Sequence, residues 1–576
     1  MAGQRSDPNT NRKKVKTGCR TCKARRVKCD EGRPSCHRCS STGRVCDGYG
    51  VWGGGAAAKQ GARAISPRTL SESVRHAVSS HYGKLSAEQE TCFRWFRYRT
   101  YTKLPLPFIT PFWHTLVLQA CAAEPAILHA ALALGSAHQR ESLEEGAARQ
   151  SWVALDAQQG FMLREYGKAI RSLQPHFSSR DGRSIQVALV VCALFTFFEN
   201  LLGRYTTANA HLHSGLRLIA ECYTCVGYSD DGTITVTAKK RGYVDDWIIE
   251  SFTRLHVQAA LLGQGLPDLY SRLPMFPIAP IPIIFQSANH AAHHMDRLML
   301  DILQLADQGS LLDNSGVDPA IPVALHERQQ ALQRELDLWI EAYNATEPDR
   351  CAGFSPVDGF YMKVLRGYHT MATIIINTCL EPARETMYDS CTADFIFLVE
   401  QLVAIWKAHV ARPVWHLNPW TTEMPRRISH SVGDKGWIPL LYFIAVKCRV
   451  HRIRLQAVRL LSQTVHKEGV WDSKLVLIIA KEIIRTEEGD FYKDFNDDDK
   501  FNVVSIPTIH DITLPPLPDY CRLYNVRVGL PEHPLGVLTL EYGYRREDGS
   551  SIGRRRRYYD LKVSRWVSTI SESPVW

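Results

Sequence analysis

The chain has 576 residues, is 45% hydrophobic and 22% charged, and has a formal net charge of +10. This composition fits a globular protein of more than one domain and excludes a low-complexity or fibrous chain. The charge is uneven: residues 1–50 hold thirteen Lys or Arg against four Asp or Glu, a net charge of +9, and the remainder is nearly neutral. One end of the chain therefore suits a polyanionic partner.

The first segment, residues 1–18, is expected to be a basic N-terminal arm. It has no apolar stretch of the kind that a secretory signal needs, and the longest apolar run of the chain, residues 187–198, is too short to span a bilayer. We therefore expect a protein with no membrane partner in a reducing compartment, where its sixteen cysteines are thiols or metal ligands. A nuclear-import candidate in the arm, which predicts localisation in the nucleus, consists of Arg12, Lys13, Lys14 and Lys16.

The next segment, residues 19–46, contains the pattern C-x2-C-x6-C twice, with an offset of seventeen residues. Structural zinc takes four ligands, so six thiolates satisfy two zinc ions only if two sulfurs bridge them. A disulfide framework needs an oxidising compartment, and iron–sulfur spacings differ from this one. Unpaired thiols and another metal are the weaker alternatives. The sequence thus predicts two Zn²⁺ ions bound by Cys19, Cys22, Cys29, Cys36, Cys39 and Cys46.

The two halves of this repeat differ in charge. The first six-residue spacer, residues 23–28, has four basic residues, whereas the second, residues 40–45, has one. Clustered cations bind duplex DNA through release of its counterions, and arginine reads guanine through two hydrogen bonds. The first half is therefore expected to contact double-stranded DNA and the second to support it. The alternative is a solvated basic loop.

Residues 16–49, KTGCRTCKARRVKCDEGRPSCHRCSSTGRVCDGY, resemble the fungal binuclear zinc-cluster (six-cysteine) transcription factors. The resemblance implies that Cys19 and Cys36 bridge the two ions. It also implies that Arg25 and Arg26 contact bases, typically of a CGG-type triplet in the major groove. The neighbouring cations would then hold DNA phosphates, which position the module without specifying sequence: Arg20, Lys23 and Lys28.

A Gly- and Ala-rich connector, residues 47–69, is expected to be a flexible linker. Some members of the resembled family dimerise through a coiled coil at this point. Here Leu70, Val74 and Ala77 complete only about one heptad, and a coiled coil needs three or four. A homodimer would have to form through another surface.

The region from 70 to 510 is expected to be a large α-helical domain. Residues 185–202 are apolar almost all round, which predicts a central buried helix, whereas residues 449–461 predict an amphipathic helix with a basic outer face. The Pro-rich run 276–285 is expected to be extended.

The region from 70 to 510 also resembles the helical fungal-specific transcription factor domain. The matching segments are EPAILHAALALGSAH (124–138), LFTFFENLLGRYTTANAHLHSGLRLI (194–219) and KCRVHRIRLQAVRLL (447–461). The resemblance implies a regulatory role.

In the last segment, residues 511–576, apolar and polar residues alternate at 537–542. Asp548-Gly549 is a plausible turn before Tyr558-Tyr559. This pattern predicts a small β-hairpin near the C-terminus. The run of four arginines at 554–557 is either an import signal or a strand-edge charge run. The predicted fold class is therefore mainly α, with a zinc module, a linker, a large all-α domain and a hairpin.

Three other clusters are interpreted as structural. The histidines at 290, 293 and 294 share a helix face, but no carboxylate or cysteine stands at a spacing that would complete a metal site. Cys222 and Cys225 are interpreted as buried thiols near a helix end. The acids at 497–499 read as a solvated loop.

No catalytic constellation is found, so an enzyme is not expected. The prediction is a sequence-specific transcription factor of RNA polymerase II genes, which contacts DNA and the transcription machinery. The alternative is a helical ligand-sensing or scaffold protein whose zinc cluster serves protein contacts.

Overall fold

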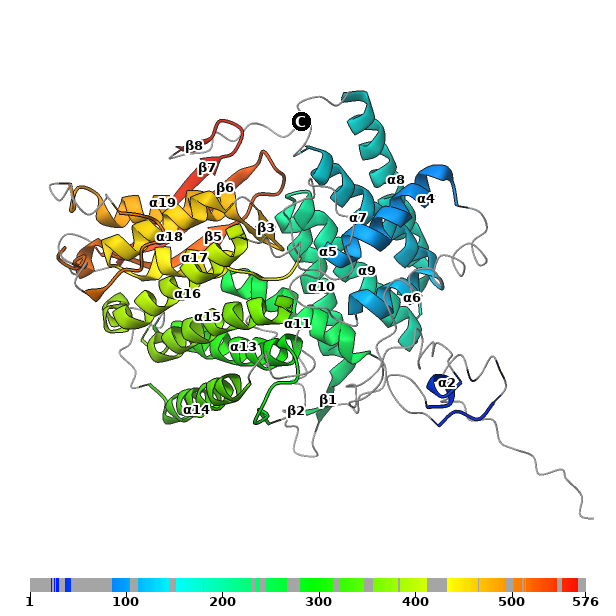
Figure 1. Cartoon of the computed structure of the whole chain (residues 1–576), viewed down its shortest axis with the longest axis horizontal. Coiled ribbons are helices and arrows are strands. Elements are labelled where there is room, and N and C mark those ends of the chain that lie inside the picture. Colours follow the sequence, from blue (N-terminus) through cyan, green and yellow to red (C-terminus); the bar gives the residue numbers. More distant parts are fainter. Residues whose placement is uncertain are drawn as a thin grey trace, which may run out of the picture.

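The computed structural model describes residues 22, 25, 27–30, 37–42, 85–103, 112–144, 152–179, 181–228, 234–238, 244–266, 280–313, 321–346, 356–381, 384–411, 433–464, 466–493, 501–509, 512, 514–545 and 552–567. Most of these residues are helical, which confirms the mainly α fold class. The helices gather in two neighbouring groups (Figure 1), which we call the N-lobe, residues 85–266, and the C-lobe, residues 280–567. The linker 47–69 and the single heptad that follows it lie outside the described residues.

The N-lobe is built mainly from α7, α8, α9 and α10. Its elements are α4 (Ala87–Trp95), η1 (Phe96–Thr100), α5 (Tyr101–Lys103), η2 (Phe112–Val117), α6 (Leu118–Cys121), α7 (Pro125–Glu144), α8 (Trp152–Phe177), α9 (Gly182–Leu201), α10 (Tyr205–Tyr223), the hairpin β1 (Thr224–Tyr228) and β2 (Ile234–Ala238), and α11 (Asp246–Leu261). The apolar faces of the N-lobe helices form one continuous core.

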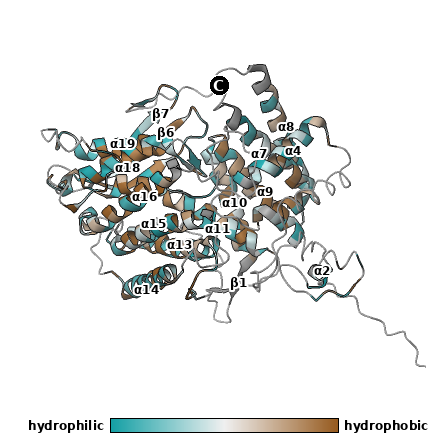
Figure 2. Cartoon of the chain, viewed as in Figure 1, coloured by the Kyte–Doolittle hydropathy of each residue, from teal (hydrophilic) through white to brown (hydrophobic). Residues whose placement is uncertain are grey.

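Helix α9 is the predicted central helix, and its burial confirms that prediction. The Asp181 carboxylate caps it by accepting hydrogen bonds from the N–H groups of Arg183 and Ser184, at 2.9 and 3.0 Å. By length and composition α9 is one of the described segments that could cross a membrane, as is the bent pair formed by residues 115–121 and 125–141. Yet 78% of the apolar window of α9 is buried inside the protein. Hydrophobic residues run along α9 in the interior (Figure 2), as expected for a core helix.

The C-lobe has its own, larger core. Its helices are α13 (Ala288–Asp313), α14 (Val323–Ala345), α15 (Pro356–Thr378), η3 (Glu385–Cys391), α16 (Thr392–Ala411), α17 (Ile438–Lys447), α18 (His451–Gln463), α19 (Ser473–Glu488) and η6 (Asp519–Cys521). Before α13, residues 280–285 belong to no helix or strand, and the chain bends at residues 283 and 284. Residues 276–279 lie outside the described part, so an extended run over 276–285 stays a prediction.

The predicted C-terminal hairpin is present as β6 (Val537–Arg545) paired with β7 (Ile552–Asp560). The structure adds two strands, so that β5 (Leu523–Gly529), β6, β7 and β8 (Arg565–Val567) form one antiparallel sheet in that order. The apolar face of this sheet packs into the core of the C-lobe, with Leu538, Leu540 and Tyr542 almost fully buried. The expected turn residues 548 and 549 lie outside the described residues.

The four arginines at 554–557 lie in β7, ahead of the short stretch that pairs with β8. Arg557 forms an ion pair with Glu482 of α19, and Arg556 lies 2.9 Å from Glu541 of β6. The run is thus part of a strand edge with two of its guanidinium groups paired, which favours the strand-edge interpretation of the sequence.

The prediction of a basic outer face on residues 449–461 is wrong. Arg449, Arg452 and Arg454 are 4%, 6% and 0% exposed. Arg454 forms ion pairs with Glu487 and, at 3.3 Å, with Glu488 at the end of α19. Burial alone would raise the pKa of Glu487, but the charges of Arg449 and Arg454 outweigh burial and lower it. Arg449 and Arg454 point inward because buried carboxylates meet them there, whereas Arg452 donates to Gln456 and Ser505.

Polar contacts join the two lobes along α11. Arg254 of α11 lies 3.0 Å from Asp434, and the indole N–H of Trp471 donates to the carbonyl of Gln258 at 3.0 Å. The short hairpin β3 (Lys467–Glu468) and β4 (Trp471–Asp472) carries Trp471 to this contact. The lobes therefore meet through buried, hydrogen-bonded groups, with β3 and β4 against the N-lobe.

Candidate metal centre and nucleic-acid interface

The cysteine-rich module is described at residue 22, residue 25 and residues 27–30 and 37–42. These residues include two predicted zinc ligands with their side chains, Cys22 and Cys29, and the backbone of a third, Cys39. They also include one predicted base contact, Arg25, and one predicted phosphate contact, Lys28. The other predicted site residues lie outside the described part: Cys19, Cys36, Cys46, Arg26, Arg20, Lys23, Arg12, Lys13, Lys14 and Lys16.

Cys22 and Cys29 are removed from solvent although the module has few apolar residues. Their exposed fractions are 0% and 5%. The N–H of Val27 donates to the carbonyl of Cys22 at 3.0 Å, which closes a turn within the first spacer. Thiol sulfur is a preferred zinc donor, and the donor set of the six-cysteine repeat fits zinc. Among the described residues alone, no three His, Cys, Asp or Glu side chains gather as a metal site.

A carboxylate links the two halves of the repeat. Asp30 follows Cys29, and its two oxygens accept hydrogen bonds from the N–H groups of His37 and Arg38, at 2.9 and 2.8 Å. These are the first N–H groups of the short helix α2 (His37–Ser40), whose unpaired amides need acceptors. Asp30 therefore connects the segment that follows Cys29, one predicted zinc ligand, to helix α2, which carries Cys39, another predicted ligand. The sequence patterns did not single out this residue.

The basic spacer is also tied to the second half. Arg25 is half-buried, and its guanidinium donates to the hydroxyl of Thr42 at 3.4 Å. The same hydroxyl donates to the carbonyl of Arg38 at 3.0 Å. Lys28, in contrast, is exposed. The described part of the spacer thus presents one cation held against the second half and one in solvent, an arrangement that a polyanion can approach.

The other histidine and cysteine clusters behave as parts of the helical region. His294 is 4% exposed, its Nε2 lies 3.3 Å from Nε2 of His290, and burial lowers the pKa of His294 to about 3. Cys222 is half-buried at the end of α10, and only the backbone of Cys225 is described. The acids at 497–499 lie outside the described residues.

Comparison with known proteins identifies the module. Residues 17–51 match the fungal Zn(2)-Cys(6) binuclear cluster domain. The chain is 24% identical over 562 residues to the aspercryptin biosynthesis cluster-specific transcription regulator atnN of Emericella nidulans, covering 84% of this chain and 88% of the relative. It is 31% identical over 205 residues to transcription regulator lscL of Purpureocillium lilacinum, covering 34% and 47% of the two chains.

A third relative, the transcriptional regulatory protein moc3 of Schizosaccharomyces pombe, is 44% identical over 64 residues, covering 11% of this chain and 12% of moc3. The similarity to atnN extends over most of the chain and therefore includes much of the helical region. No solved structure matches the fold.

Proposed function

Since residues 17–51 are a fungal Zn(2)-Cys(6) binuclear cluster domain, we propose that this protein is a sequence-specific regulator of RNA polymerase II transcription that acts in the nucleus. The observation that carries this proposal is the double C-x2-C-x6-C repeat with its basic first spacer, inside the matched residues. Similarity to proteins named as transcription regulators supports it. Recognition of DNA by this module is non-covalent, and no enzymatic step is part of the proposal.

The cluster domain, residues 19–46, would hold two zinc ions through its six cysteines. In this proposal Cys19 and Cys36 bridge both ions, as in the family that the module resembles. Zinc supplies a structural cross-link, because a site filled by thiolates has no open position for a substrate. The buried thiols of Cys22 and Cys29 and the Asp30 link between the halves support a shared centre.

The DNA contacts are assigned by the same reasoning. Arg25 and Arg26 would read a CGG-type triplet in the major groove, because a guanidinium pairs with O6 and N7 of guanine. The neighbouring cations Arg20, Lys23 and Lys28 would hold phosphates. The exposure of Lys28 supports its part in this assignment.

The rest of the chain is assigned to delivery and control. The basic arm 1–18 would direct nuclear import, and residues 47–69 would link the cluster domain to a regulatory region at 70–510 and a C-terminal segment at 511–576. Contacts with the transcription machinery would come from this regulatory part. A homodimer, if formed on DNA, would use a surface other than an adjacent coiled coil.

The test is selection of bound sequences from a random DNA pool by the full-length, zinc-loaded chain. We expect an enriched CGG-type triplet. Arg26→Ala should lower affinity for the selected site by about 1–3 kcal/mol and relax the preference at one base. Arg44→Ala, the same change in the second spacer, is the matched control and should keep the preference.

The alternative, a scaffold whose zinc cluster serves protein contacts, gives a different result in this test. It predicts no enriched sequence and only a weak dependence of binding on salt. Discrimination between the selected site and random DNA that survived Arg26→Ala intact would remove the base-reading role of Arg26.

A further inference from the structure

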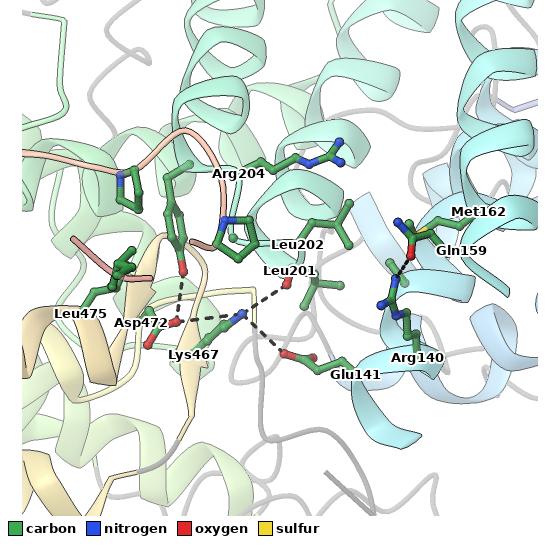
Figure 3. A pocket seen from close by; sticks show the side chains of 16 residues that line it. Arg140, Glu141, Gln159, Met162, Leu201, Leu202, Arg204, Lys467, Asp472 and Leu475 are labelled. Atoms are coloured by element: carbon green, nitrogen blue, oxygen red, sulfur yellow. Dashed lines mark hydrogen bonds and ion pairs between the residues drawn. The ribbon is translucent and has the colours of Figure 1, made fainter. Parts of the chain in front are cut away.

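A cavity of about 520 Å³ lies where the two lobes meet (Figure 3). The N-lobe contributes α7, α8 and the turn between α9 and α10. The C-lobe contributes β3, β4, the start of α19 and the loop between β5 and β6. Small-molecule sites commonly have volumes of roughly 300–1,000 Å³ and form between structural units. The cavity has this size and this location.

One part of the wall holds a compact charged cluster around Lys467 of β3. The Lys467 ammonium donates to the carbonyl of Leu201 at 3.2 Å and lies 3.9 Å from Glu141 and 4.0 Å from Asp472. Asp472 also accepts a hydrogen bond from the buried Tyr205 hydroxyl at 3.1 Å. Figure 3 shows Lys467 between the two carboxylates. This cluster bridges the lobes, and its lysine balances part of the negative charge of its two acids.

Two arginines line the N-lobe side of the same cavity. Arg140 donates to the amide oxygen of Gln159 at 3.1 Å. The guanidinium of Arg204 is 3.8 Å from Glu199, and its side chain is 40% exposed. A guanidinium at 3.8 Å from a carboxylate forms a loose ion pair, so Arg204 retains donors for a further anion. Figure 3 shows both arginines on the side of α8, away from Asp472.

The remaining wall is apolar. Met162 lies beside Gln159 at one end of the cavity and Leu475 lies beyond Asp472 at the other, with Leu202 in the middle (Figure 3), and Pro531 and Pro534 line the C-lobe side. A polar ion alone would leave this apolar surface in contact with water, whereas an apolar molecule alone would remove water from the arginines. An occupant that matches both features has one anionic group and an apolar body.

We propose that this interlobe cavity binds a small organic anion with an apolar body, whose anionic group is held by Arg140 and Arg204. The apolar body lies against Met162 and Leu202 of the N-lobe and Pro534 of the C-lobe, which packs beside Gly203. Because the occupant touches both lobes, its binding stabilises their contact. This site goes beyond the proposed function and is independent of DNA, so its failure and the failure of DNA recognition are distinguishable.

The test uses two fluorescent probes with closely similar apolar bodies on the full-length, zinc-loaded chain. The probe 1-anilinonaphthalene-8-sulfonate is an anion, and N-phenyl-1-naphthylamine lacks the sulfonate. We expect Arg140→Gln and Arg204→Gln each to weaken binding of the anionic probe about tenfold, since each removes a charge-assisted contact. Affinity for the neutral probe should stay within about twofold. Arg171→Gln, an exposed position on α8 outside the cavity lining, is the matched control.

Thermal unfolding of each variant without probe identifies those that remain folded, and either arginine variant alone is sufficient for the test. An unchanged affinity for the anionic probe in Arg140→Gln and Arg204→Gln, relative to Arg171→Gln, would overturn the proposal. So would an equal loss for both probes, since the arginines would then not be recognising the anionic group.

Discussion

The carboxylate of Asp30 accepts a hydrogen bond from the backbone N–H of His37 at 2.9 Å. Each residue directly follows a cysteine of the repeat, Asp30 in the first half and His37 in the second. The contact therefore fixes one half of the proposed cluster against the other and leaves the sulfur atoms uninvolved. The proposed metal cross-link and this carboxylate would act on the same pair of segments.

The first prediction concerns this carboxylate. We expect Asp30→Ala to weaken zinc retention about fivefold, because two helix N–H groups lose their acceptor and the second half is held less firmly. The measurement is zinc release from the full-length chain against increasing chelator. Glu31→Ala makes the same change in charge one residue later and should retain zinc like the parent. Equal zinc release from both variants would show that the Asp30 contact does not support the module.

The second prediction concerns the buried ion pairs at the end of α19. Arg454→Ala should lower the free energy of unfolding by about 3–5 kcal/mol, because Glu487 loses a partner in a site without solvent. Arg485→Ala removes an arginine that is 61% exposed and pairs with Glu482 at 2.7 Å, and it should cost less than about 1 kcal/mol. Denaturant unfolding of both variants tests the difference. Similar losses would mean that the buried Arg454–Glu487 pair adds nothing beyond a pair whose arginine is exposed.

The third prediction concerns pH. Burial raises the pKa of Asp307 on α13 to about 6, and the charge of Arg527 opposes the shift. Because the folded pKa lies above the ordinary value, the folded chain holds this proton more tightly than the unfolded chain. The resulting stability is present below about pH 4 and is lost as the pH rises through about 6.

Asp307→Asn cannot ionise, so at pH 7.5 it should be more stable than the parent by about 1 kcal/mol, a value reduced for partial solvent screening. At pH 4.5 the gain should be much smaller. Asp337→Asn, at an exposed position of α14, is the matched control. Thermal unfolding at the two pH values provides the comparison, and a pH-independent effect of Asp307→Asn would contradict the assignment.

The fourth prediction uses two helical glycines. A Cβ at Gly309 of α13 would lie 2.4 Å from the carbonyl oxygen of Cys379, which is backbone and cannot rotate away. Gly309→Ala should therefore destabilise the chain by about 1–3 kcal/mol. A Cβ at Gly167 of α8 meets nothing within 4 Å, so Gly167→Ala should stabilise it by about 0.5–1 kcal/mol. Opposite signs in thermal unfolding are expected, and the same sign for both would contradict this packing.

Local patterns in the sequence predicted several elements correctly. The apolar run at 185–202 appears as α9, and the alternation at 537–542 appears as β6 paired with β7. Each of these patterns depends on neighbouring residues, whose periodicity identifies the element. The cysteine repeat predicts a zinc cluster in the same way, because ligand type and spacing are both local, and the family match at residues 17–51 agrees with this prediction.

Features that depend on residues far apart in the chain cannot be predicted from local sequence patterns. The arginines at 449–454 look like a solvent-facing stripe. The carboxylate partners of Arg449 and Arg454, however, lie on η3 and α19, far from them in the sequence. The cavity between the lobes joins residues as far apart as Ala137 and Leu561. The role of Asp30 cannot be predicted from the sequence, because nothing near it shows that the backbone N–H of His37, seven residues away, needs an acceptor.

The most direct test of the account is DNA binding by the full-length chain before and after removal of zinc. With zinc, the chain should bind its selected oligonucleotide far more tightly than random DNA. Complete removal of the metal by a chelator should abolish this preference, and two equivalents of zinc should restore it. If the metal-free chain still held the selected oligonucleotide with unchanged affinity and preference, the proposal of a zinc-organised DNA-reading module would be contradicted.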